Sequence, residues 1–260
     1  MSLSAQLQAL LQTSTTPAGQ RLSVGLATSQ DEIRAAQRLR YQVFVEEMGA
    51  RLELEEHGVE ADRYDPYCDH LIVRDVTANK IVGGYRILTD VQAQRAGGFY
   101  SQSEFDMTRI LALPGRLMEV GRTCVHPDYR TGAVISLLWQ GLARYFTTNG
   151  FDYLIGCASV PLRCGTDEAA LLYQRLAKNS ITPEDQRVFP RVPLPKLNLA
   201  GVEPEVRVPP LVKAYLRAGA RICGEPAWDP QFNVADLFIL LRAEDVNERY
   251  ARHFFDRTAA

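Results

Sequence analysis

Hydrophobic and polar residues follow two different spacings along this chain, and each spacing predicts its own kind of element. Alternating residues or short apolar runs, typical of strands, occur at residues 21–27, 71–75, 80–88, 118–125, 153–160 and 235–241. Helical spacing begins after Ser29, where Glu32 completes a capping box, and continues to about residue 48. Further helices are expected after the turn at residues 126–128 and at residues 167–178, 211–218 and 243–255.

The order of these elements predicts an α+β fold. A hairpin signal at residues 77–80 makes the start of the sheet antiparallel, and the helix between strands 118–125 and 153–160 predicts a parallel crossover. Residues 1–20 lack a core pattern and are expected to form a flexible tail. Residues 21–260 are expected to form one domain, in which seven prolines between residues 183 and 210 predict an irregular connection.

Composition limits the classes of function. The chain of 260 residues is 46% hydrophobic, enough for a full core, and its formal net charge of −2 argues against nucleic acid as a partner. Because it has no apolar run of about 18 residues and no secretory pattern before residue 21, we expect a cytoplasmic protein. Its five cysteines are widely spaced without a CxxC pair, which predicts reduced thiols and no metal site.

The strand at residues 118–125 carries two opposite charges, Glu119 and Arg122. Residues of odd separation on a regular strand face opposite sides, so a shared cleft requires a bulge, which we expect at Gly121. Such a bulge splays neighbouring strands apart and opens a cleft beside an active site. A structural ion pair is the alternative, but removing paired charges from water is costly, and active sites use such pairs to tune proton affinity.

Several motifs between residues 24 and 241 carry a resemblance to a known family. In order they are Arg40-Tyr-Gln-Val-Phe44, Asp62-Arg-Tyr-Asp65, Asp69-His-Leu-Ile-Val, Gly84-Tyr-Arg86-Ile-Leu and Glu119-Val-Gly-Arg122. The chain resembles GNAT-type acyltransferases of the branch that includes acyl-homoserine-lactone synthases. Within that branch it is most similar to the L-ornithine N-alpha-acyltransferases. The resemblance implies a GNAT-like, mostly antiparallel mixed sheet flanked by helices, with C-terminal additions.

The resemblance also implies a reaction, namely transfer of a 3-hydroxyacyl group from acyl carrier protein to the α-amino group of L-ornithine. The catalytic residues that it implies are Glu119, Arg122 and Tyr173. The substrate-binding residues that it implies are Arg40, Phe44, Asp62, Asp65 and Arg86. The acyl-donor loop is expected to contain Cys124, Val125, Arg130 and Gly132. No bound cofactor is needed, because the carrier brings its own phosphopantetheine arm.

Some of these residues can also be explained by a purely structural role. Phe44 is typical of a core residue, Tyr173 of a packed helical tyrosine, and Asp62 and Asp65 of turn residues. Nine acidic residues stand between residues 46 and 69 against two arginines. This excess is typical of a solvated face, and it also suits a cationic acceptor such as ornithine, whose side-chain ammonium needs an anionic partner.

The loop before the central helix indicates which acyl donor is used. CoA-dependent relatives place a glycine-rich loop there, whose N–H groups hold the pyrophosphate. Here the loop reads Arg130-Thr-Gly132-Ala-Val-Ile, with the glycine one position early and Val134 and Ile135 where a small residue belongs. This loop favours acyl carrier protein, which has no nucleotide pyrophosphate. Lys213, Arg217 and Arg221 recur every four residues and form a hypothetical docking stripe for the acidic carrier if the helix extends that far.

Two other functions stay open from the sequence. An acyl-homoserine-lactone synthase or an N-acyltransferase for another amino acid is the enzymatic alternative, although those synthases carry a tryptophan where residues 48–51 read Met-Gly-Ala-Arg. A membrane-active protein is the non-enzymatic alternative, because relatives of this type have been labelled haemolysins. Peripheral contact with the inner membrane is compatible with either function.

Overall fold

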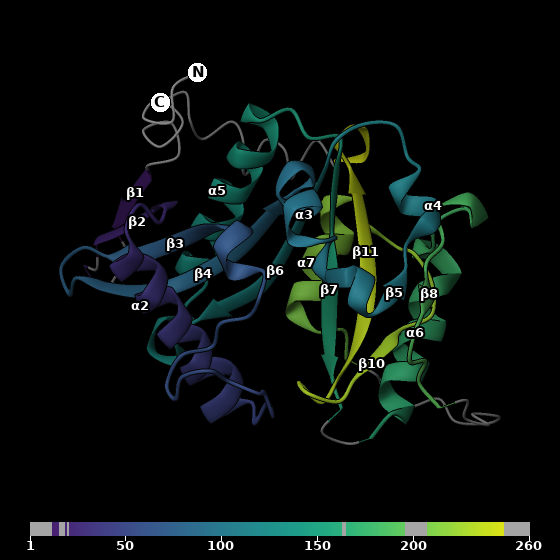
Figure 1. Ribbon diagram of the computed structural model, residues 1–260, viewed down its shortest axis with the longest axis horizontal. Coiled ribbons are helices and arrows are strands. Elements are labelled where there is room, and N and C mark those ends of the chain that lie inside the picture. The colour runs from purple at the N-terminus through teal and green to yellow at the C-terminus, as the bar shows by residue number, and fades with distance from the viewer. Residues whose placement is uncertain (1–11, 16–18, 20, 163–164, 196–206, 247–260) are drawn as a thin grey trace.

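A nine-stranded sheet forms the centre of the computed structural model, which describes residues 12–15, 19, 21–162, 165–195 and 207–246. The strand order is β1-β2-β3-β4-β6-β7-β11-β10, and β9 pairs with β11 outside this path (Figure 1). Neighbouring strands are antiparallel except β6 and β7, which are parallel and joined by helix α5 (Ala133–Thr148). The predicted α+β class and the parallel crossover around the central helix are therefore confirmed.

Six strands of the large sheet agree closely with those expected from the hydrophobic pattern, and the short strands β1, β9 and β10 were not predicted. Their bounds are β1 Gln12–Thr15, β2 Arg21–Leu26, β3 Asp69–Asp75, β4 Lys80–Thr89, β6 Leu117–Val125, β7 Tyr153–Pro161, β9 Arg221–Ile222, β10 Ala227–Asp229 and β11 Val234–Arg242. A separate two-stranded sheet pairs β5 (Phe105–Asp106) with β8 (Phe189–Pro190).

Helices cover both faces of the large sheet. On one face lie α5, α6 (Asp167–Ser180) and α7 (Pro210–Ala218), packed on the main hydrophobic core. On the other face α2 (Gln30–Arg40) packs on β4, while α3 (Asp90–Ala96) and α4 (Thr108–Leu111) belong to a second core beside it (Figure 1). Alternation along β4 explains this division, since Tyr85 and Ile87 belong to the main core and Leu88 to the second one.

The first predicted helix changes its winding before it ends. Ser29 caps α2 by accepting a hydrogen bond from the Glu32 backbone N–H, as the capping box predicts. From Tyr41 to Glu47 the chain continues as a π-helical segment, η1, and the Met48 N–H donates to the Val43 carbonyl five residues back. Single-turn π segments of this kind occur frequently at functional sites.

Gly83 lets β4 and α5 approach each other closely. A Cβ atom at Gly83 would lie 2.4 Å from Cγ1 of Val134 on α5, so any side chain there would collide with the helix. The absence of a side chain at Gly83 therefore lets Val134 and Leu138 of α5 pack directly on the backbone of β4.

Three expectations need correction or limits. Part of the predicted flexible tail forms strand β1, because Thr13 and Thr15 suit a strand and their polar neighbours suit a sheet edge. The proline-rich connection contains the short helix η5 (Glu184–Gln186) and β8, and its residues 196–206 lie outside the described part of the chain. Of the last predicted helix, at residues 243–255, the described part contains the 3₁₀ turn η6 (Ala243–Asp245), and residues 247–255 lie outside the described part of the chain. Among the described residues, no helix has the length and apolar character to cross a membrane.

Candidate active site

Strands β6 and β7 begin as neighbours and then separate. They pair only where Leu117–Glu119 face Tyr153–Ile155, although both strands continue for six residues beyond. A break in the pairing of β6 with β4 accompanies this separation, because Tyr85 faces two residues, Arg122 and Thr123. Arg122 has a left-handed backbone with φ of 52°. The expected bulge is therefore present, one position after Gly121, and the expected separation of the strands is confirmed.

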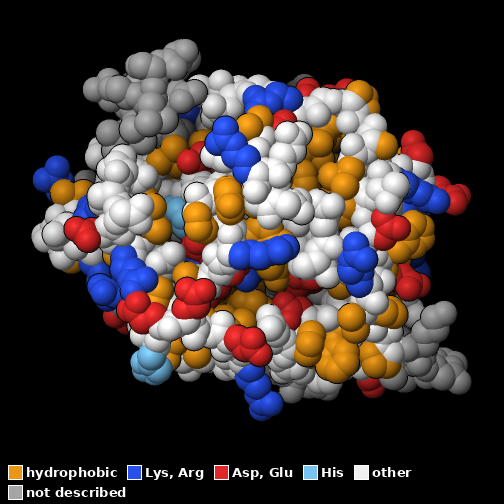
Figure 2. Space-filling view, viewed as in Figure 1, with side chains coloured by type: hydrophobic (Ala, Val, Ile, Leu, Met, Phe, Trp, Pro, Cys, Tyr) orange, Lys and Arg blue, Asp and Glu red, His pale blue; other side chains and the backbone are white. Residues whose placement is uncertain are grey.

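A cavity of about 300 Å³ lies in this opening. Its walls come from η1, from β4, from β6 starting at Glu119, from β7 and from the β10–β11 hairpin, and α7 contributes Leu211 and Tyr215. Figure 2 shows the hollowed face, where acidic, basic and hydrophobic side chains meet. A cavity of this size, largely apolar with a few charged groups, is typical of a site for a small molecule.

A cluster of three arginines and three carboxylates lies beside the cavity. Its members are Arg40, Arg86, Arg122, Glu60, Asp62 and Asp65. Asp65 accepts hydrogen bonds from Arg40 at 2.8 and 2.9 Å and from Arg86 at 2.9 Å. These arginines hold the pKa of the Asp65 carboxyl well below its usual range, although burial alone would raise it. The charges of the cluster balance within it.

Two members of this cluster, Arg86 and Arg122, line the cavity. The Arg122 guanidinium donates to Glu60 at 3.0 Å and to Asp62 at 3.2 Å, and it lies 4.7 Å from the ring centroids of Tyr100 and Phe232. These contacts hold a non-glycine residue in its left-handed conformation. Arg40, Asp62 and Asp65 lie behind the two arginines and do not reach the cavity wall.

Glu119 has a different set of partners from the one expected. Its carboxylate accepts hydrogen bonds from the backbone N–H groups of Tyr100 at 2.6 Å and Ser101 at 2.8 Å, and from the Ser101 hydroxyl. Arg122 instead pairs with Glu60 and Asp62, so the expected ion pair between Glu119 and Arg122 is wrong. The bulge brings both side chains to one cavity without joining them. Burial raises the pKa of Glu119, and the bound N–H groups oppose that rise.

Most of the residues predicted for the acyl-donor loop border the same opening. Cys124, Val125 and Arg130 line the cavity, and Gly132 caps α5 with φ of 92°. The Arg130 guanidinium is bound by both carboxylate oxygens of Glu47 at 2.6 Å and donates to the Val125 carbonyl at 3.1 Å. Burial raises the pKa of Cys124 to about 12, which keeps its thiol protonated at neutral pH. Phe44 lines the cavity and also packs in the core beneath α2.

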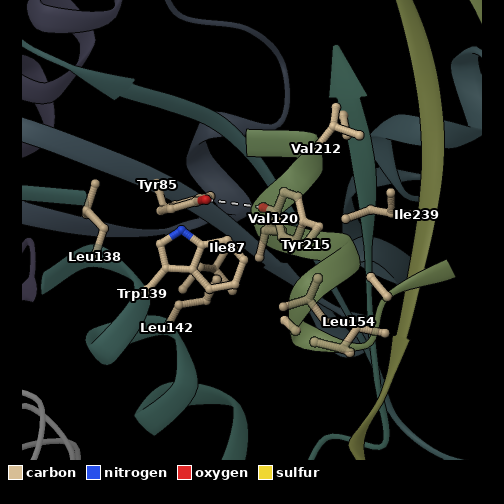
Figure 3. Close-up of a cluster of buried hydrophobic side chains, with 14 of the residues drawn as sticks. Tyr85, Ile87, Val120, Leu138, Trp139, Leu142, Leu154, Val212, Tyr215 and Ile239 are labelled. Carbon is tan, nitrogen blue, oxygen red and sulfur yellow. Dashed lines mark hydrogen bonds between the residues drawn. The ribbon is translucent and has the colours of Figure 1, made fainter. Parts of the chain in front are cut away.

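Tyr173 is not brought to the cavity, and a different tyrosine is. Tyr173 lies half-buried on α6 against the main core. Tyr215 on α7 lines the cavity, and its hydroxyl lies 3.1 Å from that of Tyr85 (Figure 3). Burial raises the pKa of Tyr215 well above 10, so its hydroxyl keeps its proton. Sequence reasoning missed Tyr215 because helical spacing alone predicts a packed residue.

Three acidic residues that the sequence did not single out meet at the cavity. Glu104 precedes β5, Asp229 ends β10 and Asp236 lies on β11, and their carboxyl groups lie within 4.8 Å of one another. Burial raises the pKa of Glu104 to about 9, with the charge of Asp236 adding to it, and burial raises the pKa of Asp236 to about 6. Glu104 is distant in sequence from the two aspartates of the β10–β11 hairpin, so no local spacing indicates that the three meet.

The splayed strands and the charged cavity between them define the class of protein, a GNAT-type N-acyltransferase, and a family model described as acetyltransferase (GNAT) domain matches residues 39–140. Two solved structures share the fold at 14% identity. The acyl-homoserine-lactone synthase LasI has a TM-score of 0.54 over 92% of this chain and 96% of its own. The N-acyl amino acid synthase FeeM, from uncultured soil microbes, has a TM-score of 0.51 over 87% of this chain and 93% of its own.

Curated sequences give the particular family. L-ornithine N(alpha)-acyltransferases from Brucella abortus and Rhodobacter capsulatus are each 39% identical to this chain over 251 residues. The alignments cover 90% of this chain and 88% and 94% of the two relatives. The chain therefore belongs to the L-ornithine N(alpha)-acyltransferase family, as the motifs predicted.

Proposed function

We propose that this protein transfers a 3-hydroxyacyl group from acyl carrier protein to the α-amino group of L-ornithine. The observation that carries the proposal is the 39% identity over 90% of the chain to relatives named L-ornithine N(alpha)-acyltransferases. The cavity between β6 and β7 supports it physically, because it offers cationic and anionic groups to a zwitterionic acceptor within one largely apolar space.

The acyl-donor side supports a carrier protein in preference to CoA. The Arg130 guanidinium, which would otherwise be free for a pyrophosphate, is bound by Glu47 and the Val125 carbonyl. Val134 is buried in the first turn of α5, where CoA-dependent enzymes need a small residue next to the phosphates. A phosphopantetheine arm needs no such cradle. It enters the opening beside Cys124 and Val125, where a backbone N–H of β6 stabilises the thioester oxyanion.

On the acceptor side, Arg122 and Arg86 bind the α-carboxylate, and the neutral α-amine attacks the thioester carbonyl carbon. The new C–N bond forms as the C–S bond breaks, and the pantetheine sulfur leaves as a thiolate. Glu119 accepts the proton lost by the amine, directly or through a water molecule, and Tyr215 gives a proton to the thiolate. Arg40, Asp62 and Asp65 act as positioning residues, because they hold Arg86 and Arg122 against the cavity.

Acyl transfer by the purified protein tests this function. We expect N-acylornithine, detected by mass spectrometry, from a 3-hydroxyacyl carrier protein and L-ornithine, with the same acyl group on CoA used much less well. S-adenosylmethionine and other amino acids as acceptors test the alternative enzymes, and leakage from liposomes tests the membrane-active alternative. Leakage without any acylated product would overturn the proposal.

Variants of the two charged residues test the mechanism. Glu119→Gln should lower turnover at least about a hundredfold, the usual scale for an acid–base group. Arg122→Lys is the suitable partner variant, because Arg122→Met would remove one of the two cations that bind buried Glu60 and half-buried Asp62. The lysine keeps the charge but not the bidentate fork, so the KM for ornithine should rise. Normal kinetics in both variants would remove these residues from the mechanism.

A further inference from the structure

Beside the cavity lies a second group of acidic residues, Glu104, Asp229 and Asp236, and the two aspartates line the cavity. Asp229 accepts hydrogen bonds from the backbone N–H groups of Gln231 at 2.8 Å and Phe232 at 3.2 Å, while Asp236 accepts one from the Ser159 hydroxyl at 2.6 Å. Asp236 is only 3% exposed and Asp229 8%. In the described part of the chain, no lysine or arginine forms an ion pair with Glu104, Asp229 or Asp236.

One oxygen of this group lacks any partner. Oε1 of Glu104 is fully buried and accepts no hydrogen bond from the described residues, while Oε2 lies 3.5 Å from the Cys157 thiol. A buried carboxyl oxygen without a hydrogen-bond partner costs free energy unless a ligand supplies one. The nearby arginines could donate a hydrogen bond to this oxygen only by breaking existing ion pairs, because they are bound by Glu60, Asp62 and Asp65.

We propose that Glu104, Asp229 and Asp236 form the subsite for the side-chain ammonium of a diamino acid acceptor. The inference rests on the proposed function and adds the means by which ornithine is selected. A primary ammonium has three N–H donors, and three convergent carboxyl groups can accept all of them. Phe232 and Val234 line the same cavity and suit the methylene chain between the two ends of the acceptor.

The two charged groups then define a direction for the acceptor. Arg86 and Arg122 bind the α-carboxylate at one end, and the three acids bind the terminal ammonium at the other. An amino acid without a terminal ammonium would leave buried carboxyl groups without a donor, which is the condition under which polar sites discriminate most strongly. Asp62 and Asp65, from the acidic segment 46–69, are not available to bind the terminal ammonium, because both already form ion pairs with arginines.

Norvaline tests the proposal, because it has the carbon chain of ornithine without the terminal ammonium. The wild-type protein should prefer ornithine over norvaline at least about a hundredfold in kcat/KM. Asp236→Asn, Asp229→Asn and Glu104→Gln should each lower that preference at least about tenfold, mainly through the KM for ornithine, with norvaline kinetics changed less than about threefold. Glu225→Gln, an exposed acid after β9, is the matched control and should keep the full preference.

The proposal would be overturned if the three variants lost kcat/KM equally with ornithine and norvaline, or if their preference for ornithine were unchanged. Calorimetric measurement of ornithine and norvaline binding tests the ammonium subsite independently of the proposed function. Acylation of neither amino acid would contradict the function, whereas tight binding of ornithine lost in Asp236→Asn would still support the subsite. Titration with Mg²⁺, Ca²⁺ and Mn²⁺ tests the competing occupant. Metal binding that displaces ornithine, or activity abolished by a chelator, would assign the acids to a metal.

Proton release gives an independent readout. Asp229, Asp236, Tyr100 and Cys157 surround Glu104, and the charge of Arg122 acts on Asp236. At pH 7 the raised pKa of about 9 keeps Glu104 protonated in the free protein. An ammonium favours the ionised form, so ornithine should release about one proton on binding at pH 7, and norvaline should release fewer. Calorimetry in buffers of different ionisation enthalpy measures this number, and equal release by both amino acids would contradict the subsite.

Discussion

Single residues decide which groups can exchange protons in the cavity. Tyr215 is the buried tyrosine of α7 that borders the opening between β6 and β7, and a second hydroxyl, that of Tyr85, lies 3.1 Å away (Figure 3). Its raised pKa keeps it a proton donor at neutral pH. Tyr173, which the family resemblance suggested, lies on α6 outside the cavity wall.

Two conservative variants separate these tyrosines. Tyr215→Phe should lower kcat about tenfold to a hundredfold with a carrier donor, because the leaving thiolate loses its proton donor. Tyr173→Phe should leave kcat within about twofold. Steady-state kinetics of the two purified proteins at pH 7 measure both values, and thermal melting checks that Tyr215→Phe folds. A large effect in Tyr173→Phe with none in Tyr215→Phe would reverse the assignment.

The sequence predicted many of the residues around the site but few of their pairings. Glu119 and Arg122 both reach the cavity, as the expected bulge implied. Their partners come from residues 60–62 and 100–101, which are distant in the chain, and helical or strand periodicity carries no information about such contacts. Glu104, Asp229 and Asp236 were missed for the same reason.

At the scale of elements, the opening depends on how β6 and β7 part. Gly156 lies on β7 just after the last paired residue, and a Cβ atom there would lie 2.4 Å from the Val120 carbonyl oxygen. Backbone cannot move aside as a side chain can. The glycine therefore holds the two strands in contact at the point from which they diverge.

Alanine at this position should move β6 away from β7. Gly156→Ala should destabilise the protein by about 1–3 kcal/mol, the usual cost of overpacking, and lower kcat/KM at least about tenfold by displacing the cavity wall. Gly84→Ala on β4 is the control, since its Cβ would lie 3.7 Å from the nearest atom. Urea unfolding and acyl-transfer kinetics measure the two effects. Equal stability in both variants would show that the strands tolerate a wider separation.

The sequence predicted the positions of helices and strands better than their local backbone geometry. Residues 29–48 were expected to be one helix, and the amphipathic pattern continues through the change to π winding at Tyr41. The hydrophobic pattern indicates which side of a helix is buried. A change of about one residue per turn over a short segment hardly alters the spacing of the buried residues, so the sequence does not reveal the π winding. The short 3₁₀ helix η3 (Tyr100–Ser103), which supplies the donors to Glu119 and is followed by Glu104, is too short to show a hydrophobic period in the sequence.

At the scale of the whole molecule, α7 separates the cavity from a basic groove. Tyr215 and Leu211 face the cavity, while Lys213, Leu216 and Arg217 border the groove. Arg175 of α6 and Arg207 add further positive charge. The expected docking stripe is thereby corrected, because α7 ends at Ala218 with Gly219 in a left-handed conformation, and Arg221 lies on β9. The helix that positions Tyr215 thus also carries two exposed basic residues of the groove.

This arrangement suits a carrier that docks on α6 and α7 and sends its arm past α7 into the opening. A helix is roughly 10 Å across, so the flexible phosphopantetheine arm has a short way to travel. Lys213→Glu with Arg217→Glu should raise the KM for acyl carrier protein at least about tenfold and flatten its dependence on salt, because charge attraction to an acidic carrier is lost. The KM for ornithine should change less than about twofold.

The matched control reverses two exposed arginines on the other face of the sheet, Arg38→Glu with Arg95→Glu, and changes the net charge by the same amount. Steady-state kinetics at several salt concentrations compare the two double variants. If both raise the KM for the carrier equally, the attraction reflects total charge and the carrier docks elsewhere. An effect confined to Lys213→Glu with Arg217→Glu would place the carrier on the groove, on the side of α7 away from Tyr215.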